Sequence, residues 1–238
     1  MASDSTARLP LEGRRILLGI TGSIAAYKAA VLCRLLKTAG ADVRVVMTPL
    51  AKQFITPLTM ATLSKNPILV EFFDPENGAW NSHVSLGEWA DCYLIAPATA
   101  NVIAKLAHGQ ADDMLTTVTL AATCPKLVAP AMNTHMLENP ITQDNLKTLE
   151  HYGFTVIPSG SGMLACGDVG SGRLPDEGVL VDYVLRELAC AKDLKGKKVV
   201  VSAGATQEPM DPVRYLTNHS TGKMGYAVAR ACMLRGAD

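Results

Sequence analysis

The stretch from Arg15 to Gly40 constrains the fold most strongly, because it combines a buried strand, a tight turn and a helix. Residues 16–20 (ILLGI) form a continuous apolar run, as expected for a strand of a parallel sheet that is covered on both faces. In the turn that follows, Thr21-Gly22-Ser23, Gly22 allows an unusual φ and close backbone approach. Ser23 is a suitable N-cap for a helix from Ile24 to about Leu36.

This turn has two interpretations. A strand that enters a helix through small residues directs unpaired amide groups and the positive end of the helix dipole at one point, which suits a phosphate. The same residues fit equally well an ordinary strand–helix turn that binds nothing. The turn lacks the three-glycine dinucleotide fingerprint and the P-loop lysine pattern, so a phosphate here would belong to a mononucleotide.

Short apolar segments and helical segments then alternate as far as Ala189. We predict strands at 43–47, 68–72, 92–96, 127–129 and 155–157, and helices at 52–54, 57–64, 100–108, 113–123, 141–152 and from Asp176 to about Ala189. The alternation is typical of an α/β fold with a doubly wound, Rossmann-like parallel sheet. Ligands of such sheets bind at the carboxyl ends of strands, where Thr21, Thr48, Thr99 and Asn133 are expected.

The pattern begins again after residue 190. A strand is predicted at 199–202, a turn at 203–206 and a helix from about Lys223 to Arg235. One strand and one helix cannot bury their apolar faces alone. We therefore predict three parts: a disordered tail at 1–13, a domain at 14–190, and, at 191–238, a linker with the truncated start of a second α/β unit.

Composition excludes several classes of protein. Lys plus Arg and Asp plus Glu both total 22, and no basic stripe occurs, so nucleic acid is not an expected partner. No apolar run reaches the ~18 residues that span a bilayer, and the polar N-terminus has no signal-peptide core. We expect a cytoplasmic protein that does not enter membranes. The six cysteines form no CxxC pair, so no metal site is predicted.

Three polar residues stand out as candidates for chemistry. His83 lies in a polar stretch, 74–87, where it is either simply solvated or moves protons near neutral pH. Asn133 follows a buried strand and is either a helix N-cap or an amide that binds a carboxylate or an amine. Cys166 lies in a glycine-rich loop, 159–175, which is either a flexible connector or a lid that brings a thiol to a site.

Five segments occur in an order that resembles the homo-oligomeric flavin-containing cysteine decarboxylases. They are TGSIA from Thr21, HVSLGEWAD from His83, APATAN from Ala96, PAMNTHM from Pro130 and ACG from Ala165. Within this family they are most similar to the phosphopantothenoylcysteine decarboxylase half of bifunctional coenzyme A biosynthesis proteins. The segment NHSTGKMGYA from Asn218 resembles the start of the synthetase half, which in complete form would use CTP and Mg.

The resemblance implies FMN as the cofactor. Gly22, Ser23 and Ile24 would hold its phosphate. The ribityl chain and ring would be held by Thr48, Thr99, Ala100, Asn101 and Ala131.

The implied reaction converts 4'-phosphopantothenoyl-cysteine to 4'-phosphopantetheine. The substrate thiol is oxidised to a thioaldehyde, carbon dioxide leaves, and the resulting enethiol is reduced again. His83 would act as acid and base, and Cys166 would donate the last proton. Substrate contacts would come from Asn133, which binds the carboxylate, and from Met136 and Ala165.

The family also implies a homo-oligomer, either a trimer or a dodecamer, with flavin between subunits. Gly87 stands where some relatives carry an arginine that contacts substrate. Two alternatives are a peptidyl-cysteine decarboxylase and a non-catalytic FMN-binding regulatory protein. The synthetase-like segment favours the coenzyme A reaction over the first. The presence of both His83 and Cys166 favours an enzyme over the second.

Overall fold

The computed structural model describes residues 9–73, 78, 80–163, 167 and 169–238. The chain divides into two compact units, residues 1–184 and 185–238. The division falls inside α8 (Glu177–Leu188), a few residues before the predicted domain end at 190. None of the helices in the described ranges is long and apolar enough to cross a membrane.

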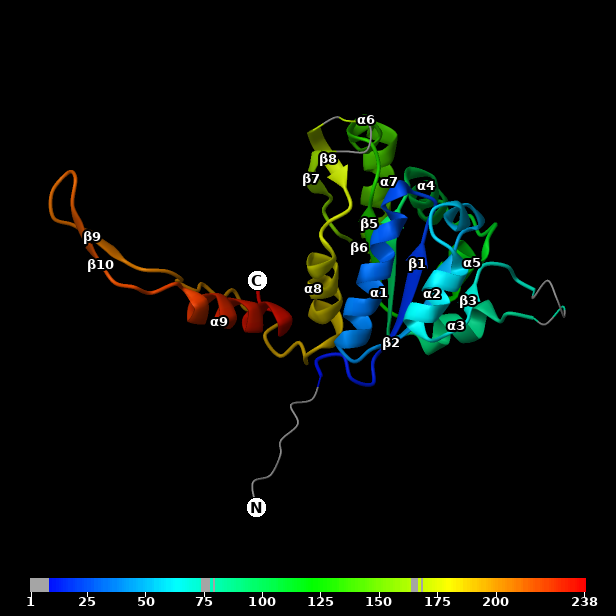
Figure 1. Cartoon of the computed structure of the whole chain (residues 1–238), viewed down its shortest axis with the longest axis horizontal. Helices are drawn as coiled ribbons and strands as arrows, with labels where there is room; N and C mark the ends of the chain where they lie inside the picture. Colours follow the sequence, from blue (N-terminus) through cyan, green and yellow to red (C-terminus); the bar gives the residue numbers. More distant parts are fainter. Residues whose placement is uncertain (1–8, 74–77, 79, 164–166, 168) are drawn as a thin grey trace, which may run out of the picture. The chain divides into compact units, whose positions relative to one another are not determined.

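A six-stranded parallel sheet forms the centre of the first unit, in the order β3-β2-β1-β4-β5-β6 (Figure 1). All five neighbouring pairs are parallel. The chain moves outward from β1 to β3 and then returns to β4 on the other side of β1, so the predicted doubly wound sheet is confirmed. The strands are β1 (Arg15–Ile20), β2 (Asp42–Met47), β3 (Ile68–Leu69), β4 (Cys92–Ala98), β5 (Lys126–Pro130) and β6 (Thr155–Val156).

Helices cover both faces of this sheet. Figure 1 shows α1 (Lys28–Thr38) and α2 (Pro57–Ser64) in front of the strands. The other face carries α3 (His83–Trp89), α4 (Ala100–Ala107), α5 (Met114–Ala121) and α7 (Pro140–His151). Short helices complete the unit: η1 (Ile24–Tyr27), η2 (Pro49–Gln53) and α6 (Thr134–Glu138).

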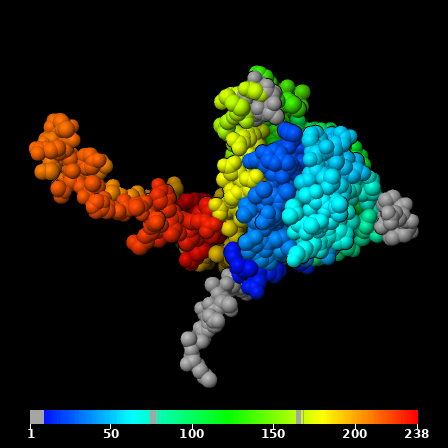
Figure 2. All heavy atoms as spheres, viewed as in Figure 1, coloured from blue at the N-terminus to red at the C-terminus, as the bar shows by residue number. Residues whose placement is uncertain are grey.

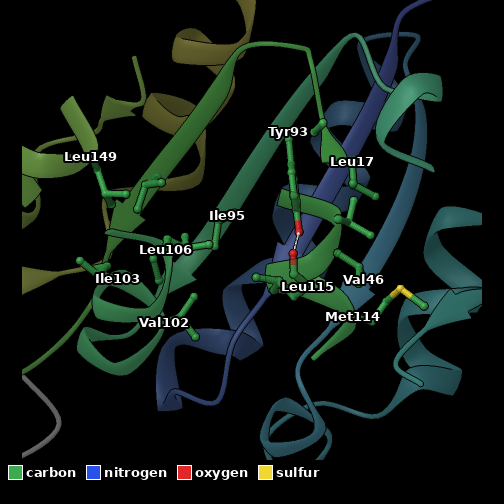
Figure 3. Close-up of a cluster of buried hydrophobic side chains, with 14 of the residues drawn as sticks. Leu17, Val46, Tyr93, Ile95, Val102, Ile103, Leu106, Met114, Leu115 and Leu149 are labelled. Carbon is green, nitrogen blue, oxygen red and sulfur yellow. Dashed lines mark hydrogen bonds between the residues drawn. The ribbon is translucent and has the colours of Figure 1, made fainter. Parts of the chain in front are cut away.

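The core under the second group of helices is built from alternate residues of the strands. Leu17, Tyr93 and Ile95 point to this face and are fully buried (Figure 3). The Tyr93 hydroxyl donates a hydrogen bond to the Leu115 carbonyl of α5 at 3.2 Å. Complete burial raises the pKa of Tyr93, so this hydroxyl stays protonated and fixes α5 on the sheet.

Four expectations need correction. Residues 1–8 of the predicted disordered tail lie outside the described residues, but Leu11 is fully buried and its amide donates to Ala39 O at 2.9 Å. The end of the polar stretch 74–87 is helical, because the Ser82 hydroxyl caps α3. The predicted strand 68–72 shortens to β3. The glycine-rich loop 159–175 contains an antiparallel hairpin, β7 (Gly160–Met163) and β8 (Val169–Arg173).

The second unit contains α9 (Lys223–Leu234) and an antiparallel ribbon of β9 (Gln207–Pro209) and β10 (Tyr215–Thr217). The helix confirms the prediction, but the predicted strand at 199–202 is absent from these described residues. The Val199 amide donates to Asp238 O, and the Asp238 amide donates to Lys197 O. Hydrogen bonds to Asp238 alone do not make a β-ladder along all four residues of the predicted strand.

Candidate active site

The carboxyl ends of four neighbouring strands form one edge of the sheet. The Thr21 hydroxyl, after β1, donates to Pro97 O of β4 at 2.8 Å and accepts from the Thr99 amide at 3.2 Å. The Thr48 amide, after β2, donates to Ile20 O, and the Ala131 amide, after β5, donates to Ala98 O. These bonds hold the strand ends together, so the predicted placement of these residues at the carboxyl edge is confirmed.

A pocket of about 250 Å³ opens at this edge, and Gly22, Thr48, Thr99 and Asn101 line it. The Thr48 hydroxyl oxygen is buried and has no hydrogen-bond partner among the described residues. An orphaned buried hydroxyl is costly unless a ligand or water satisfies it. The pocket therefore offers a hydrogen-bonding group to a polar ligand.

Gly22 is required by space, not by backbone torsion. Its φ does not fall in the left-handed region, so the turn does not use the unusual φ that glycine allows. A Cβ at this position would lie 2.5 Å from Leu50 Cγ, so only glycine lets the turn close against η2. The expected close approach is confirmed, and Ser23 caps η1 as predicted, with its hydroxyl accepting from the Ala25 amide at 3.3 Å.

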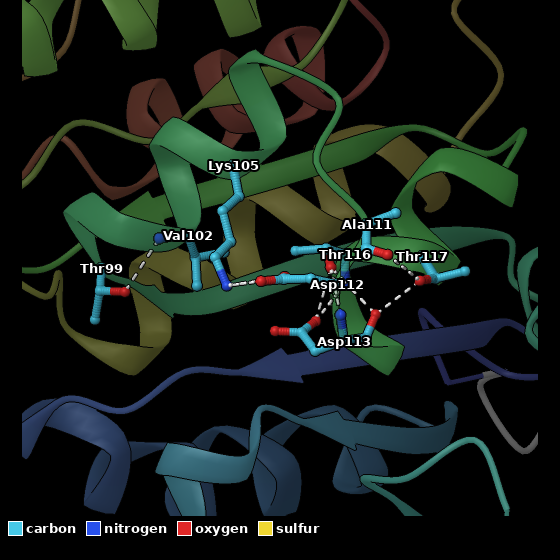
Figure 4. A network of polar contacts seen from close by, with 8 residues as sticks. All are labelled: Thr99, Val102, Lys105, Ala111, Asp112, Asp113, Thr116 and Thr117. Carbon is cyan, nitrogen blue, oxygen red and sulfur yellow. Dashed lines mark hydrogen bonds and ion pairs between the residues drawn. The ribbon is translucent and has the colours of Figure 1, made fainter.

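One wall of the pocket is a polar network between α4 and α5 (Figure 4). Lys105 Nζ lies 2.8 Å from both oxygens of Asp112, and this bond lowers the pKa of that carboxyl group. Asp113 and Thr116 form a capping box at the start of α5. The Thr99 hydroxyl accepts from the Val102 amide and caps α4. The network fixes the helix N-termini that face the pocket.

A larger cleft of about 560 Å³ lies beside this pocket. Its walls come from the β1 turn with the start of α1, from the end of β5, and from the hairpin β7–β8. The lining residues are Ser23, Ile24, Ala25, Tyr27, Lys28, Ala131, Met132, Asn133, Met163, Gly172, Arg173 and Leu174. Predicted cofactor residues are thus divided between the two spaces, with Ser23, Ile24 and Ala131 here and Gly22, Thr48, Thr99 and Asn101 in the pocket.

The hairpin is fastened to the end of β5 and to α6 (Figure 2 shows it as yellow-green beside green α6). The Met132 amide donates to Gly172 O at 2.9 Å, and the Thr134 hydroxyl donates to Ser171 O at 2.7 Å. Gly172 has φ +113, and a Cβ there would lie 2.2 Å from Met132 O. Over the residues described, the hairpin therefore forms a wall of the cleft. Ala165 and Cys166 lie outside them.

Asn133 is a helix N-cap and also lines the larger cleft. Its side-chain oxygen accepts from the His135 amide at 2.9 Å, which makes it the N-cap of α6. The same residue lines the larger cleft. Because the oxygen faces the helix amide, the NH₂ group is the end of the side chain that suits an oxyanion. Met136 is half exposed on α6 and is not one of the residues that line the cleft.

His83 begins α3 and lines neither of the two spaces. Its Nδ1 is buried and has no hydrogen-bond partner within the described part of the chain. The ring lies edge-on to Phe72 at 6.3 Å between centroids and 6.0 Å from the Trp80 ring. A single chain therefore brings Asn133 together with the cofactor candidates but does not bring His83 to them.

Two charged residues of the cleft were not predicted. The Lys28 side chain is only 7% exposed, and its Nζ lies 3.5 Å from Asp176 Oδ1 and 4.0 Å from Glu177 Oε1. Arg173 lines the opposite wall. The sequence did carry a signal for Lys28, because this lysine falls at one of the positions where apolar residues recur along the helix predicted at 24–36. No group of three or more histidine, cysteine or acidic side chains in the described ranges is placed to hold a metal.

Comparison with known proteins assigns both parts of the sequence. The Flavoprotein family matches residues 4–189, and the family described as DNA/pantothenate metabolism flavoprotein C-terminal domain matches residues 194–238. The coenzyme A biosynthesis bifunctional protein CoaBC of Vibrio vulnificus (strain YJ016) is 49% identical over 228 residues, which cover 96% of this chain. The chain spans 57% of that relative's length.

Two solved structures share the fold. A mutant PPC decarboxylase complexed with pantothenoylaminoethenethiol is 34% identical with a TM-score of 0.65, and the match covers 72% of this chain and 96% of that one. The FMN-dependent cysteine decarboxylase SpaF is 33% identical with a TM-score of 0.66, covering 76% of this chain and 99% of that one. Because the first family match includes most of the sequence and every residue that lines the two spaces, this chain belongs to the flavoprotein family.

Proposed function

We propose that this chain binds FMN and decarboxylates 4'-phosphopantothenoyl-cysteine to 4'-phosphopantetheine in coenzyme A biosynthesis. The observation that carries the proposal is the 560 Å³ cleft, in which Ser23, Ile24, Ala131 and Asn133 gather at the carboxyl edge of the sheet. The similarity to CoaBC and to a PPC decarboxylase supports this substrate.

The residues at the carboxyl edge fit FMN. The Thr48 hydroxyl is buried without a partner among the described residues and lines the pocket with Gly22, so it can donate to a ribityl or phosphate oxygen. Ser23, Ile24, Thr99, Ala100, Asn101 and Ala131 complete the proposed cofactor site. When bound, FMN supplies reversible hydride transfer at the thiol-bearing carbon of the substrate, so carbon dioxide is lost without net oxidation.

Asn133 orients the substrate in this proposal. Asn133 lines the cleft, and its amide NH₂ group would donate to the substrate carboxylate. Met136 and Ala165 are proposed to contact the substrate beside it. Cys166 donates the proton that completes the final reduction.

His83 is proposed to move the proton of the oxidative decarboxylation from a neighbouring subunit. Within its own chain it lines neither space, and its buried Nδ1 has no partner among the residues described. A homo-oligomer, trimer or dodecamer, would bring this ring to a cleft that already contains Asn133. The active assembly is thus proposed to be oligomeric and cytoplasmic.

The second part of the sequence suggests a further activity of the whole protein. The match at residues 194–238 and the CoaBC relatives support a synthetase half that joins phosphopantothenate to cysteine with CTP and Mg. We assign that activity to a protein of the relatives' length.

The test uses the purified protein. We expect a yellow preparation with an absorbance band near ~450 nm, and mass spectrometry should show that added 4'-phosphopantothenoyl-cysteine loses carbon dioxide. Cys166→Ser should keep the flavin but accumulate the decarboxylated, unreduced enethiol. Normal product at the normal rate from this variant would exclude the role given to Cys166. Turnover of a peptide with a C-terminal cysteine in place of the proposed substrate would favour a peptidyl-cysteine decarboxylase.

A further inference from the structure

Asn81 ties the start of α3 to the segment that follows β3. Its backbone amide donates to Phe72 O at 2.9 Å, and its side-chain amide donates to Glu71 O at 3.0 Å. Two donors of one residue thus bind two consecutive carbonyl groups. Asn81 stands shortly before His83, the first residue of α3. These bonds therefore fix the backbone from which the His83 side chain projects.

Aromatic rings hold the imidazole itself. The Phe72 ring meets the His83 ring edge-on, with 6.3 Å between centroids and 89° between planes. The Trp80 ring lies 6.0 Å from the imidazole, and Trp80 is held against Phe73 by a β-bridge and by an edge-to-face contact of their rings at 5.2 Å. Phe72 also packs against the hydrophobic core. This anchored residue therefore supports the His83 ring with its side chain and Asn81 with its carbonyl.

The cap of α3 does not provide the same connection. The Ser82 hydroxyl accepts from the Ser85 amide at 3.2 Å, which orders the first helical turn but ties it to no other element. The packing of α3 on α5 involves a later turn, where Leu86 and Gly87 are buried. Asn81 therefore supplies a tertiary connection at the end of the helix where the cap is only local.

We propose that Asn81 is a positioning residue for His83 and holds the imidazole in the place from which it moves the proton of the decarboxylation. This inference rests on the proposed function, which gives His83 that proton. Proton transfer needs heavy atoms within about 2.6–3.2 Å, and a misplacement of ~1 Å can lower a rate about 100-fold. Asn81 lines neither the cleft nor the smaller pocket, so we expect it to act through His83.

The first test separates kcat from KM. Asn81→Ala removes the side-chain bond to Glu71 O, and Asn81→Asp keeps the size of the side chain but has no amide donor. Both changes should lower kcat about tenfold, while KM and flavin content stay the same. Asn66→Ala is the matched control, because this side-chain amide also donates to a backbone carbonyl, Val43 O at 2.8 Å, but at the amino edge of the sheet. It should leave kcat unchanged.

The second test asks whether the effect passes through His83. In a His83→Asn protein, adding Asn81→Ala should leave the residual rate of carbon dioxide release unchanged, because the group that Asn81 positions is gone. A further tenfold loss in that background would overturn the inference, since the role of Asn81 would then be structural. A normal kcat for Asn81→Ala in the otherwise unaltered protein, or a raised KM at normal kcat, would also overturn it while the decarboxylase assignment stands. Failure of the proposed function would appear instead as no decarboxylation by the unaltered protein.

Discussion

At the scale of single residues, His83 shows an arrangement that packing alone does not explain. Its Nδ1 is buried without a hydrogen-bond partner among the described residues, beside the Phe72 and Trp80 rings. Leaving such an atom unpaired costs about 1–3 kcal/mol. A ring that forms its hydrogen bond only with a ligand or a neighbouring subunit would explain why this cost is accepted.

His83→Asn should therefore lower the rate of decarboxylation by at least about 100-fold, because the proton transfer loses its carrier. Flavin content and melting temperature should stay close to those of the unaltered protein. The rate is measured as carbon dioxide release under saturating substrate. His151→Asn, at an exposed position of α7, is the matched control. A His83→Asn protein that works at the normal rate would remove this residue from the mechanism.

Cysteine reactivity should differ sharply along the chain. Burial raises the pKa of Cys33 to about 11, and this residue lies on the buried face of α1. At pH 8 only about one thiol in a thousand would be ionised there. Cys190 is exposed. Peptide mapping after brief iodoacetamide treatment at pH 8 should find Cys190 modified and Cys33 intact, and Cys33 should react only after unfolding. Equal labelling of both in the native protein would contradict the buried position of Cys33.

The positions of some site residues could be predicted from the sequence, and those of others could not. Thr48, Thr99 and Asn133 could be placed at the carboxyl edge because each directly follows an apolar strand, and the structure confirms that position. Their roles stay predictions. Lys28 and Arg173 could not be assigned to one cleft from the sequence, because the position of the hairpin β7–β8, which carries Arg173, could not be predicted.

At the scale of elements, the hairpin β7–β8 depends on the absence of a side chain at Gly172. This residue has φ +113, and a Cβ added to it would lie only 2.2 Å from Met132 O. Gly172→Ala would therefore strain the backbone and break the bond from the Met132 amide. We expect a loss of at least about 2 kcal/mol in the free energy of unfolding, or local detachment of the hairpin with a large rise in KM. Urea unfolding and steady-state kinetics measure these two effects.

Gly178→Ala is the matched control for this experiment. Gly178 lies in the first turn of α8, has no left-handed φ, and a Cβ there would meet nothing within 4 Å. Alanine should be neutral or slightly stabilising at this position. Equal stability of Gly172→Ala and Gly178→Ala, with unchanged KM, would show that the hairpin is not fastened as described.

Elements with strong apolar periodicity could be predicted, and those held by local polar bonds could not. The strands of the sheet follow from runs such as residues 16–20 and 92–96. The hairpin was hidden because glycine and serine supply no alternation of apolar residues. The start of α3 was hidden because it depends on one cap, Ser82, within a polar segment. The strand expected at 199–202 has the right composition but lacks a facing strand among the described residues.

At the scale of the whole molecule, the doubly wound sheet explains why the site lies where it does. The strand order reverses beside β1, so the segments after β1, β2, β4 and β5 open at one edge. The two spaces described at this edge are lined only by residues up to Leu174. Both linings lie within the first unit, residues 1–184. We therefore expect the first unit to bind flavin by itself.

A chain that ends at Cys190 tests this independence. It keeps α8 complete, retains both linings and includes the whole Flavoprotein match at 4–189. We expect it to purify with about one flavin per chain and with the melting temperature of the flavin-binding unit unchanged. A chain that ends at Val184 cuts α8 and removes Leu185 and Leu188, which are both buried, so it should melt at a lower temperature. If the chain ending at Cys190 were colourless while the complete chain is yellow, residues 191–238 would have to support the flavin site.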